Sequence, residues 1–213
     1  QNNDVWSSPD GMNWTRIAVG AGWIPRESHM SAVNGSRMWV LGGGRTFAPE
    51  YLNDVWSSLD GLNWTQATAA APWPARRWSA AVAHKGKIWV LGGYSPGTWH
   101  SDIWSSSNGV NWTSVGGGPW PARCEHTVVG HAEALWVIGG STSTGKTNDV
   151  WYTANWVGWD VNQNGTPDMR EDFDGNGVPD AFEDFNADGQ LDAFQDFDGN
   201  GQADGLEDLN GNG

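Results

Sequence analysis

The sequence predicts an all-β protein: an incomplete β-propeller of about three and a half blades, followed by an irregular rod of stacked calcium-binding loops. Two observations carry this prediction. A repeat of about 50 residues fills the first three quarters of the chain, and a twelve-residue acidic cycle fills the last quarter. We therefore divide the chain into a propeller segment at 1–155 and a segment of calcium-binding repeats at 156–213.

The long repeat is clearest in two short phrases. The first phrase, NDVWSSPDGMNWT, recurs with few changes at 3–15, 53–65 and 101–113, and its NDVW part recurs at 148–151. The second phrase is MWVLGG, IWVLGG and LWVIGG, at 38–43, 88–93 and 135–140. Short Trp- and Val-rich runs bounded by Gly, Asn, Asp and Ser are typical of β-strands. A period of about 50 residues with four such strands is typical of a propeller blade.

Each repeat predicts four strands in a fixed order. We expect an inner strand after an arginine, a second strand that ends in Gly-Gly, a third at DVW and a fourth at NWT. The Gly-Gly pairs indicate positive φ or a close approach of backbone. The Asp-Gly and Asn-Gly steps at 10–11, 60–61 and 108–109 predict tight hairpins between the two outer strands.

The number of blades is too small for closure. The chain holds the outer half of one blade, two whole blades and a last blade with three strands, whereas closed propellers have about four to eight blades. We therefore expect either that the chain is part of a longer propeller or that neighbouring chains complete it. The acidic cycle also stops within a repeat, at Gly213.

These phrases resemble kelch repeats, in the DVWSSxDGxNWT variety common in microbial surface proteins. The S-x-D-G-x-N-W turn also resembles the Asp-box of sialidase-type propellers. The resemblance covers about residues 1–153 and implies architecture rather than activity. In kelch repeats the recurring arginine, here Arg26, Arg76 and Arg123, is a structural link between blades. Sialidases gather three arginines around the carboxylate of a ligand, but we expect these three arginines to have the structural role instead.

The acidic cycle has the residue pattern of a calcium loop. The pattern is D-x-[DN]-x-[DN]-G-x-x-D, four times in register and a fifth time in part, with glutamate at position twelve of three turns. Calcium takes about six to eight oxygen ligands, which positions 1, 3, 5, 9 and 12 supply around a sharp-turn glycine. The predicted ligands of Ca²⁺ are Asp160, Asn162, Asn164, Asp168, Glu171, Asp172, Asp174, Asn176, Asp180, Glu183, Asp184, Asn186, Asp188, Asp192, Asp196, Asp198, Asn200, Asp204, Glu207, Asp208, Asn210 and Asn212.

The alternative to a calcium rod is a solvated, disordered acidic tail. Disorder requires neither a fixed glycine nor apolar residues in phase, such as Phe173, Phe185 and Phe197. The cycle leaves no room for the helices of paired EF-hands or of a dockerin-like module. It resembles thrombospondin type 3 repeats over about residues 160–213, which implies calcium-stacked loops with little regular structure. Gln195 replaces the glutamate at position twelve, so the third site should be the weakest.

The charge belongs almost entirely to this cycle. The net charge of the chain is −14, and residues from 160 onward contribute 12 Asp, 3 Glu and one Arg, which also sum to −14. No basic patch exists to neutralise phosphates, which disfavours nucleic acid as a partner. The sequence contains no apolar stretch of about 18 residues, so it does not predict a segment that spans a membrane. Long calcium arrays suit the calcium concentrations outside cells, so we expect a secreted or cell-surface protein.

Residues that could carry catalysis are few, and the sequence predicts no enzyme. A galactose-oxidase-like copper site needs two histidines and two tyrosines, one of them linked to a cysteine. The only cysteine, Cys124, lies at a repeat position held elsewhere by Glu27 and Arg77. His29 and His126 share a position that serine fills in the middle repeat, which favours core hydrogen bonding. No acid pair shows a general acid and base placement.

Two further sets of residues are candidates for ligands or glycans. Trp23, Trp73 and Trp120 precede Pro or Ile-Pro on loops, and indole faces that share one side of the domain would bind sugar rings. N-x-[ST] acceptor sequences predict N-glycosylation at Asn13, Asn34, Asn63 and Asn111.

The predicted function is therefore extracellular, non-enzymatic and dependent on calcium. We expect an adhesion or assembly protein, in the assembling case a fibre subunit, whose partners are calcium ions and either other protein chains or surface glycans. Two alternatives stay open: a lectin-like carbohydrate-binding module, and the scaffold part of a secreted oxidase or glycosidase.

Overall fold

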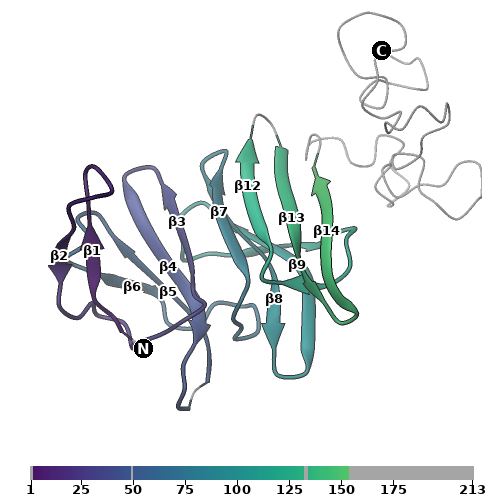
Figure 1. The fold of residues 1–213 in the computed structure, drawn as a ribbon, viewed down its shortest axis with the longest axis horizontal. Coiled ribbons are helices and arrows are strands. Elements are labelled where there is room, and N and C mark those ends of the chain that lie inside the picture. Colours follow the sequence, from purple (N-terminus) through teal and green to yellow (C-terminus); the bar gives the residue numbers. More distant parts are fainter. Residues whose placement is uncertain (1, 49, 132–133, 154–213) are drawn as a thin grey trace, which may run out of the picture. The chain divides into compact units, whose positions relative to one another are not determined.

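A computed structural model describes residues 2–48, 50–131 and 134–153. These residues form fourteen β-strands and no helix, which confirms the all-β class. Residues Gln1–Tyr152 make up one compact unit. Within it four antiparallel sheets follow one another side by side, with β1 and β2 at one end and β12 to β14 at the other (Figure 1).

The two central sheets are complete four-stranded meanders. The second sheet contains β3 (Met30–Asn34), β4 (Arg37–Gly44), β5 (Tyr51–Ser58) and β6 (Thr65–Thr68) in that order. The third sheet repeats this order with β7 (Ala80–His84), β8 (Lys87–Ser95), β9 (Thr98–Ser106) and β10 (Thr113–Gly117). The order of strands expected from the repeat is therefore confirmed in both sheets, but the fourth strand begins only at the threonine of NWT, Thr65 or Thr113.

The end sheets contain part of the same pattern. The first sheet pairs β1 (Val5–Ser7) with β2 (Thr15–Ala18), the two outer strands of a repeat. In the fourth sheet β13 (Ala134–Thr142) pairs with β11 (Arg123–Cys124), β12 (Thr127–His131) and β14 (Gly145–Tyr152). The first three sheets have the two, four and four strands that the sequence predicts, whereas the fourth sheet has four strands rather than three because the two-residue strand β11 joins it.

The Gly-Gly pairs are required by the backbone of the second strand. Gly42 and Gly43 have φ values of 53° and 100°, and the register shifts between Leu41 and Gly43. A Cβ atom on Gly43 would stand 2.8 Å from the carbonyl oxygen of Glu27. Residues with a side chain rarely adopt this φ and would also clash here. Both predicted reasons for these glycines, positive φ and close approach, are confirmed.

The hairpins between the outer strands lie where the sequence predicts them, but they are longer than tight Asp-Gly turns. Residues 59–64 connect β5 to β6, and the carboxylate of Asp60 organises them. Its Oδ1 accepts hydrogen bonds from the backbone N–H of Leu62 and Asn63, at 2.9 and 2.8 Å. These bonds hold the pKa of Asp60 well below its usual range, the Asn63 backbone contributing most. The loop exceeds two residues because it includes Leu62 and Asn63, whose backbone N–H groups bind this carboxylate.

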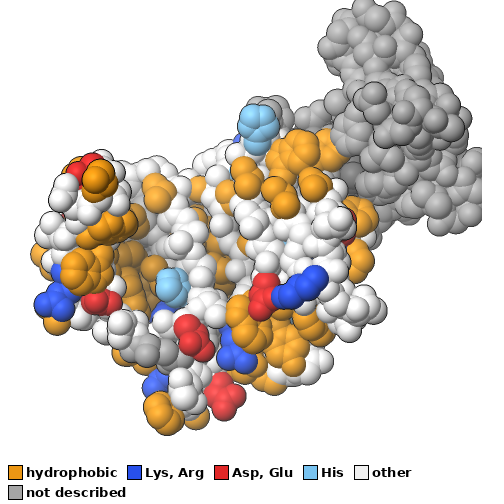
Figure 2. Space-filling model, in the orientation of Figure 1, with side chains coloured by type: hydrophobic (Ala, Val, Ile, Leu, Met, Phe, Trp, Pro, Cys, Tyr) orange, Lys and Arg blue, Asp and Glu red, His pale blue; other side chains and the backbone are white. Residues whose placement is uncertain are grey.

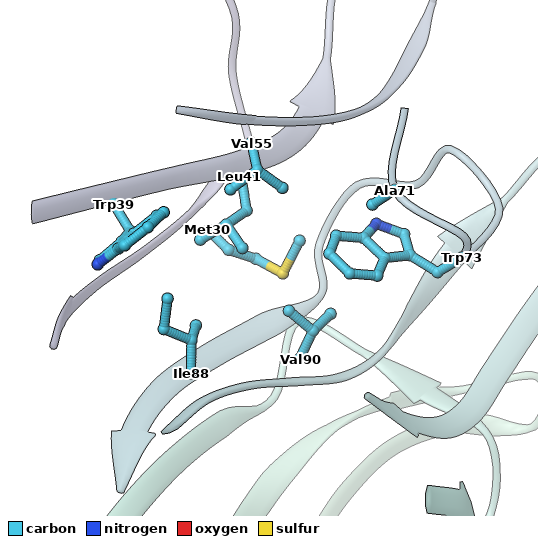
Figure 3. Packing of buried hydrophobic residues seen from close by; sticks show 8 residues of the cluster. All are labelled: Met30, Trp39, Leu41, Val55, Ala71, Trp73, Ile88 and Val90. Atoms are coloured by element: carbon cyan, nitrogen blue, oxygen red, sulfur yellow. The ribbon is translucent and has the colours of Figure 1, made fainter. Parts of the chain in front are cut away.

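The largest hydrophobic core lies between the second and third sheets (Figure 3). It is made of buried side chains from both sheets and from the segment that joins them: Met30, Trp39, Leu41, Val55, Ala71, Trp73, Ile88 and Val90. Trp73 follows β6 and inserts between the sheets, with its ring edge-on to Trp112 at a centroid distance of 4.4 Å. The segment after an outer strand therefore acts as a wedge that joins each sheet to the next.

The recurring arginines also join neighbouring sheets. The backbone of Arg76 belongs to the second sheet, because its N–H donates to Leu52 O at 3.1 Å and its carbonyl accepts from Gly43 N at 3.0 Å. Its guanidinium belongs to the third sheet, where it donates to Gly92 O at 2.9 Å and to both carboxylate oxygens of Asp102. Equivalent bidentate pairs join Arg26 with Asp54 and Arg123 with Asp149. The predicted structural role of these arginines is confirmed.

Candidate functional site

The predicted calcium ligands, Asp160 to Asn212, all lie outside the described residues, as does Gln195. Within the described part of the chain no group of three or more His, Cys, Asp or Glu side chains could hold a metal ion. Asp54, Asp102 and Asp149 there pair with arginines, and Asp10 and Asp60 organise hairpin loops. Calcium binding by the acidic cycle stays a prediction.

The expectation that three loop tryptophans form an exposed sugar-binding face is wrong. Trp23, Trp73 and Trp120 are buried, with 7, 1 and 3% of their surface exposed. The segments that carry Trp23 and Trp73 fold inward because the side-chain amides of Asn3 and Asn53 hold their backbone. Asn53 Nδ2 donates to the carbonyl oxygens of Ala71 and Trp73, at 2.9 and 3.1 Å. These indoles are wedges between sheets, and a sugar ring does not reach them.

The predicted glycan acceptors lie at turns. Asn13, Asn63 and Asn111 are exposed in equivalent hairpin loops, and Asn34 is half-buried at the turn between β3 and β4. The amide nitrogens of Asn13 and Asn63 donate to the aspartate that organises each loop, at 2.7 and 2.8 Å. Loop geometry therefore accounts for asparagine at these two positions, and glycosylation stays a prediction.

Cys124 and His126 are buried repeat positions. Cys124 lies on β11, opposite Ser141 of β13, and burial raises the pKa of its thiol to about 11. Burial, and to a lesser extent the neighbouring charge of Arg123, lower the pKa of His126 to about 4. At neutral pH the thiol is therefore protonated and the imidazole is neutral, which suits both side chains to the core.

The fourth sheet exposes apolar side chains that its counterparts bury. Leu41 and Leu91 are fully buried in the second and third sheets, whereas Ile138, the equivalent residue of the fourth sheet, is 41% exposed. The same holds for Val55, which is fully buried, and its equivalent Val150, which is 57% exposed. In the second sheet the equivalent side chains, Leu41 and Val55, face the third sheet. Ile138 and Val150 therefore lie on the side of the fourth sheet that corresponds to this contact. We call this surface the trailing face.

The first sheet exposes the complementary surface. Trp6 and Trp14 are 50 and 58% exposed. Their equivalents in the third sheet, Trp104 and Trp112, hold the wedge residue Trp73 between them, at centroid distances of 6.2 and 4.4 Å. The first sheet thus presents a tryptophan pair without its wedge, which we call the leading face. Figure 2 shows hydrophobic side chains gathered over β1 and β2 and, at the other end, over β12 to β14.

A cluster of four aromatic rings and one arginine lies at the ends of β8 and β9, and the sequence reasoning missed it. The half-buried residues of this aromatic cluster are Tyr51, Arg77, Trp78, Tyr94 and Trp99. Figure 2 shows hydrophobic side chains beside Lys or Arg side chains around the lower ends of these strands. One signal in the sequence could have found the cluster: Arg77, Trp78 and Tyr94 depart from the residue types of the other repeats.

Comparison with known proteins adds no relative to these observations. No family model matches the chain, and no curated protein sequence matches it. The described residues contain no helix that is long and apolar enough to span a membrane. Any assignment of function therefore rests on the chain's own sequence pattern and geometry.

Proposed function

We propose that the chain is an extracellular, calcium-stabilised assembly protein. Its repeated sheets are a propeller-like segment that joins neighbouring copies head to tail, and its acidic cycle is a calcium-ordered rod. In this role it is a fibre subunit rather than an enzyme. The observation that carries the proposal is the exposure of Ile138 and Val150 at one end and of Trp6 and Trp14 at the other.

The two faces support head-to-tail contact because they are the two sides of one interface that the chain already uses internally. Between the second and third sheets, residues equivalent to the trailing face pack against residues equivalent to the leading face. Different surfaces that meet in this way form a heterologous contact, which gives a ring if it closes and a filament if it does not. Large apolar side chains contribute about 1.5–3 kcal/mol each when they leave water, so four of them provide a substantial driving force.

The acidic cycle supports a mechanical role for calcium. Carboxylates repeated every twelve residues repel one another without metal, and bound calcium neutralises them and fixes the loops. Because the ligand sets form only in the ordered loops, metal binding and ordering are coupled. Calcium at extracellular concentrations would thus set the stiffness of the rod that each propeller-like segment carries.

The test of head-to-tail contact is the particle mass of end-face variants in millimolar calcium. The wild-type chain should form particles of several times 23.1 kDa, and Trp6→Ala/Trp14→Ala should shift them toward the single-chain mass. Ile138→Ser/Val150→Ser should do the same from the other face. Leu59→Ser is the matched control, because Leu59 is 60% exposed on the hairpin loop between β5 and β6 and belongs to neither end sheet.

The outcomes separate the proposal from nonspecific adhesion. An equal mixture of the two double variants should form pairs, because each retains one intact face, but no longer particles. A wild-type chain that stays at 23.1 kDa across concentrations, or a Leu59→Ser variant that disperses as the double variants do, would rule out the proposed contact.

A further inference from the structure

We propose that the aromatic cluster binds a carboxylate-bearing saccharide, with Arg77 taking the carboxylate and the aromatic rings taking the sugar. This site is independent of the end faces and of the acidic cycle. It lies where the second and third sheets meet. Tyr51 comes from β5, Tyr94 and Trp99 come from β8 and β9, and Arg77 and Trp78 come from the segment before β7.

The cluster is held as one unit. The guanidinium carbon of Arg77 lies 4.1 Å from the ring centroid of Trp78 and 4.9 Å from that of Tyr51. The ring of Tyr94 lies 6.1 Å from Trp78 and 5.5 Å from Trp99. Two backbone hydrogen bonds of 3.0 Å join Arg77 to Tyr94. A preorganised group of this kind loses little side-chain freedom when a ligand binds.

The arginine of the cluster keeps its charge for a ligand. Among the described residues, Arg26, Arg76 and Arg123 each pair with an aspartate, whereas no carboxylate lies within ion-pair distance of Arg77. Its Nε is buried without a hydrogen-bond partner in the described part of the chain, so a ligand carboxylate would bond the two Nη atoms rather than Nε. Stacking on Trp78 occupies the faces of the guanidinium and leaves its edge for bidentate bonds to a carboxylate.

The repeat itself shows that these residues are not required by the fold. The bridging pair Arg77 and Tyr94 corresponds to Glu27 and Gly44 in the second sheet and to Cys124 and Ser141 in the fourth. Trp78 corresponds in the same way to Ser28 and Glu125, and all three have positive φ, at 58°, 51° and 57°. A bulky residue at positive φ is strained, and the equivalent positions do without one. The scaffold therefore tolerates many side chains here, and the middle repeat carries an arginine among aromatic rings.

Space for the arginine depends on a small neighbour. A Cβ atom on Gly44 would lie 3.0 Å from Cδ of Arg77 and 3.1 Å from the carbonyl oxygen of Glu50. Gly44 does not have positive φ, so a larger residue there would be limited by these two close neighbours rather than by backbone conformation. The absence of a side chain at Gly44 lets Arg77 extend over the ring of Tyr51.

A sugar acid fits this chemistry better than a purely charged or a purely apolar ligand. The flat C–H face of a pyranose packs on aromatic rings, which supply apolar area with little loss of conformational freedom. A carboxylate on the same ring then reaches the guanidinium edge, where charge-assisted bonds are about twice as strong as neutral ones. The combination predicts selectivity for an acidic sugar over its neutral counterpart.

The test is calorimetric titration of the full chain with a trimer of galacturonic acid and with the neutral trimer of galactose. We expect the acidic trimer to bind at least about tenfold more tightly, since a bond to a charged group contributes about 1.5–3 kcal/mol. Arg77→Gln should abolish this preference, and Trp99→Ala should weaken binding of both trimers. Lys87→Gln removes the same charge at the opposite end of β8 and should change nothing.

Three results would overturn the proposal. They are equal affinity for the two trimers, undiminished binding by Arg77→Gln, and binding of a tetra-aspartate peptide in place of either sugar. Arg77→Lys keeps the charge and the fold but loses the planar fork, so it should retain part of the preference. Circular dichroism of each variant distinguishes a lost site from a lost fold.

Discussion

The wedge tryptophan of the central core should be the most costly single side chain to remove. Trp73 is 1% exposed and lies between the second and third sheets, edge-on to Trp112 and tilted against Trp104. Truncation of a buried Trp to Ala costs about 3–5 kcal/mol, and aromatic pairs add about 0.5–1.5 kcal/mol beyond area. We therefore expect Trp73→Ala to lower the free energy of unfolding by about 4 kcal/mol.

The assay is urea denaturation followed by far-ultraviolet circular dichroism, in chelator and at low concentration. With a denaturant slope of about 2 kcal/mol per molar, the midpoint should fall by about 2 M. Trp14→Ala is the matched control, because Trp14 is equivalent to Trp112 but is 58% exposed and should change the free energy by less than about 0.5 kcal/mol. Equal midpoint shifts for the two variants would show that the wedge tryptophan does not hold the sheets together.

Three further predictions concern buried polar side chains. The pKa of His126 is about 4 in the folded chain against 6.5 ordinarily, so as pH falls the unfolded chain binds a proton at His126 before the folded chain does. The free energy of unfolding should therefore fall as pH drops from 6.5 to 4. In urea titrations His126→Ser, which introduces the residue type of the middle repeat, should reduce this dependence on pH. Cys124, with a pKa of about 11 caused chiefly by burial, should resist iodoacetamide at pH 8 in the folded chain and react in urea; rapid labelling of the folded chain would contradict its burial. Arg76→Met should lower the free energy of unfolding by about 3 kcal/mol because it leaves Asp102 unpaired. In thermal unfolding the double variant Arg76→Met/Asp102→Leu should recover most of that loss. A double variant that is no more stable than Arg76→Met would show that the cost comes from packing instead.

The order of the strands was predictable because the same strand sequences recur in the same order in each repeat. DVW and WVLGG mark the same strands in each sheet, and the recurrence of Arg26, Arg76 and Arg123 marks the same link. A position that recurs with period near 50 is under one structural constraint, and burial of its side chain is the commonest such constraint. The repeat therefore revealed the sheets and their joints.

The burial of the loop tryptophans is not predictable from their loop sequence, because such loops usually lie at the surface. Trp73 precedes proline, which is typical of surface turns, yet the amide of Asn53 fixes its segment between two sheets. The hairpin loops are longer than the sequence predicts for a similar reason, because the carboxylate of Asp60 accepts backbone hydrogen bonds that a two-residue turn would not need. Side-chain-to-backbone hydrogen bonds over long sequence separations leave no periodic signal in the sequence.

The aromatic cluster was not predictable from periodicity because it departs from it. Arg77 and Tyr94 occupy positions where the other repeats have small or acidic residues, and Tyr51 joins them from another sheet. A search for recurring residues discards such positions. In a repeat protein the fold is found in what recurs, and a binding site is better sought where the repeat changes.

Assembly through the end faces and ordering of the acidic cycle by calcium are tested together by the mass and radius of wild-type particles with and without calcium. Light scattering in millimolar calcium should give particles of many chains, and excess chelator should loosen the rods and change the particle radius, with recovery when calcium returns. A particle of 23.1 kDa in both conditions would rule out the assembly, and a radius that does not respond to the chelator would rule out ordering of the rod by calcium.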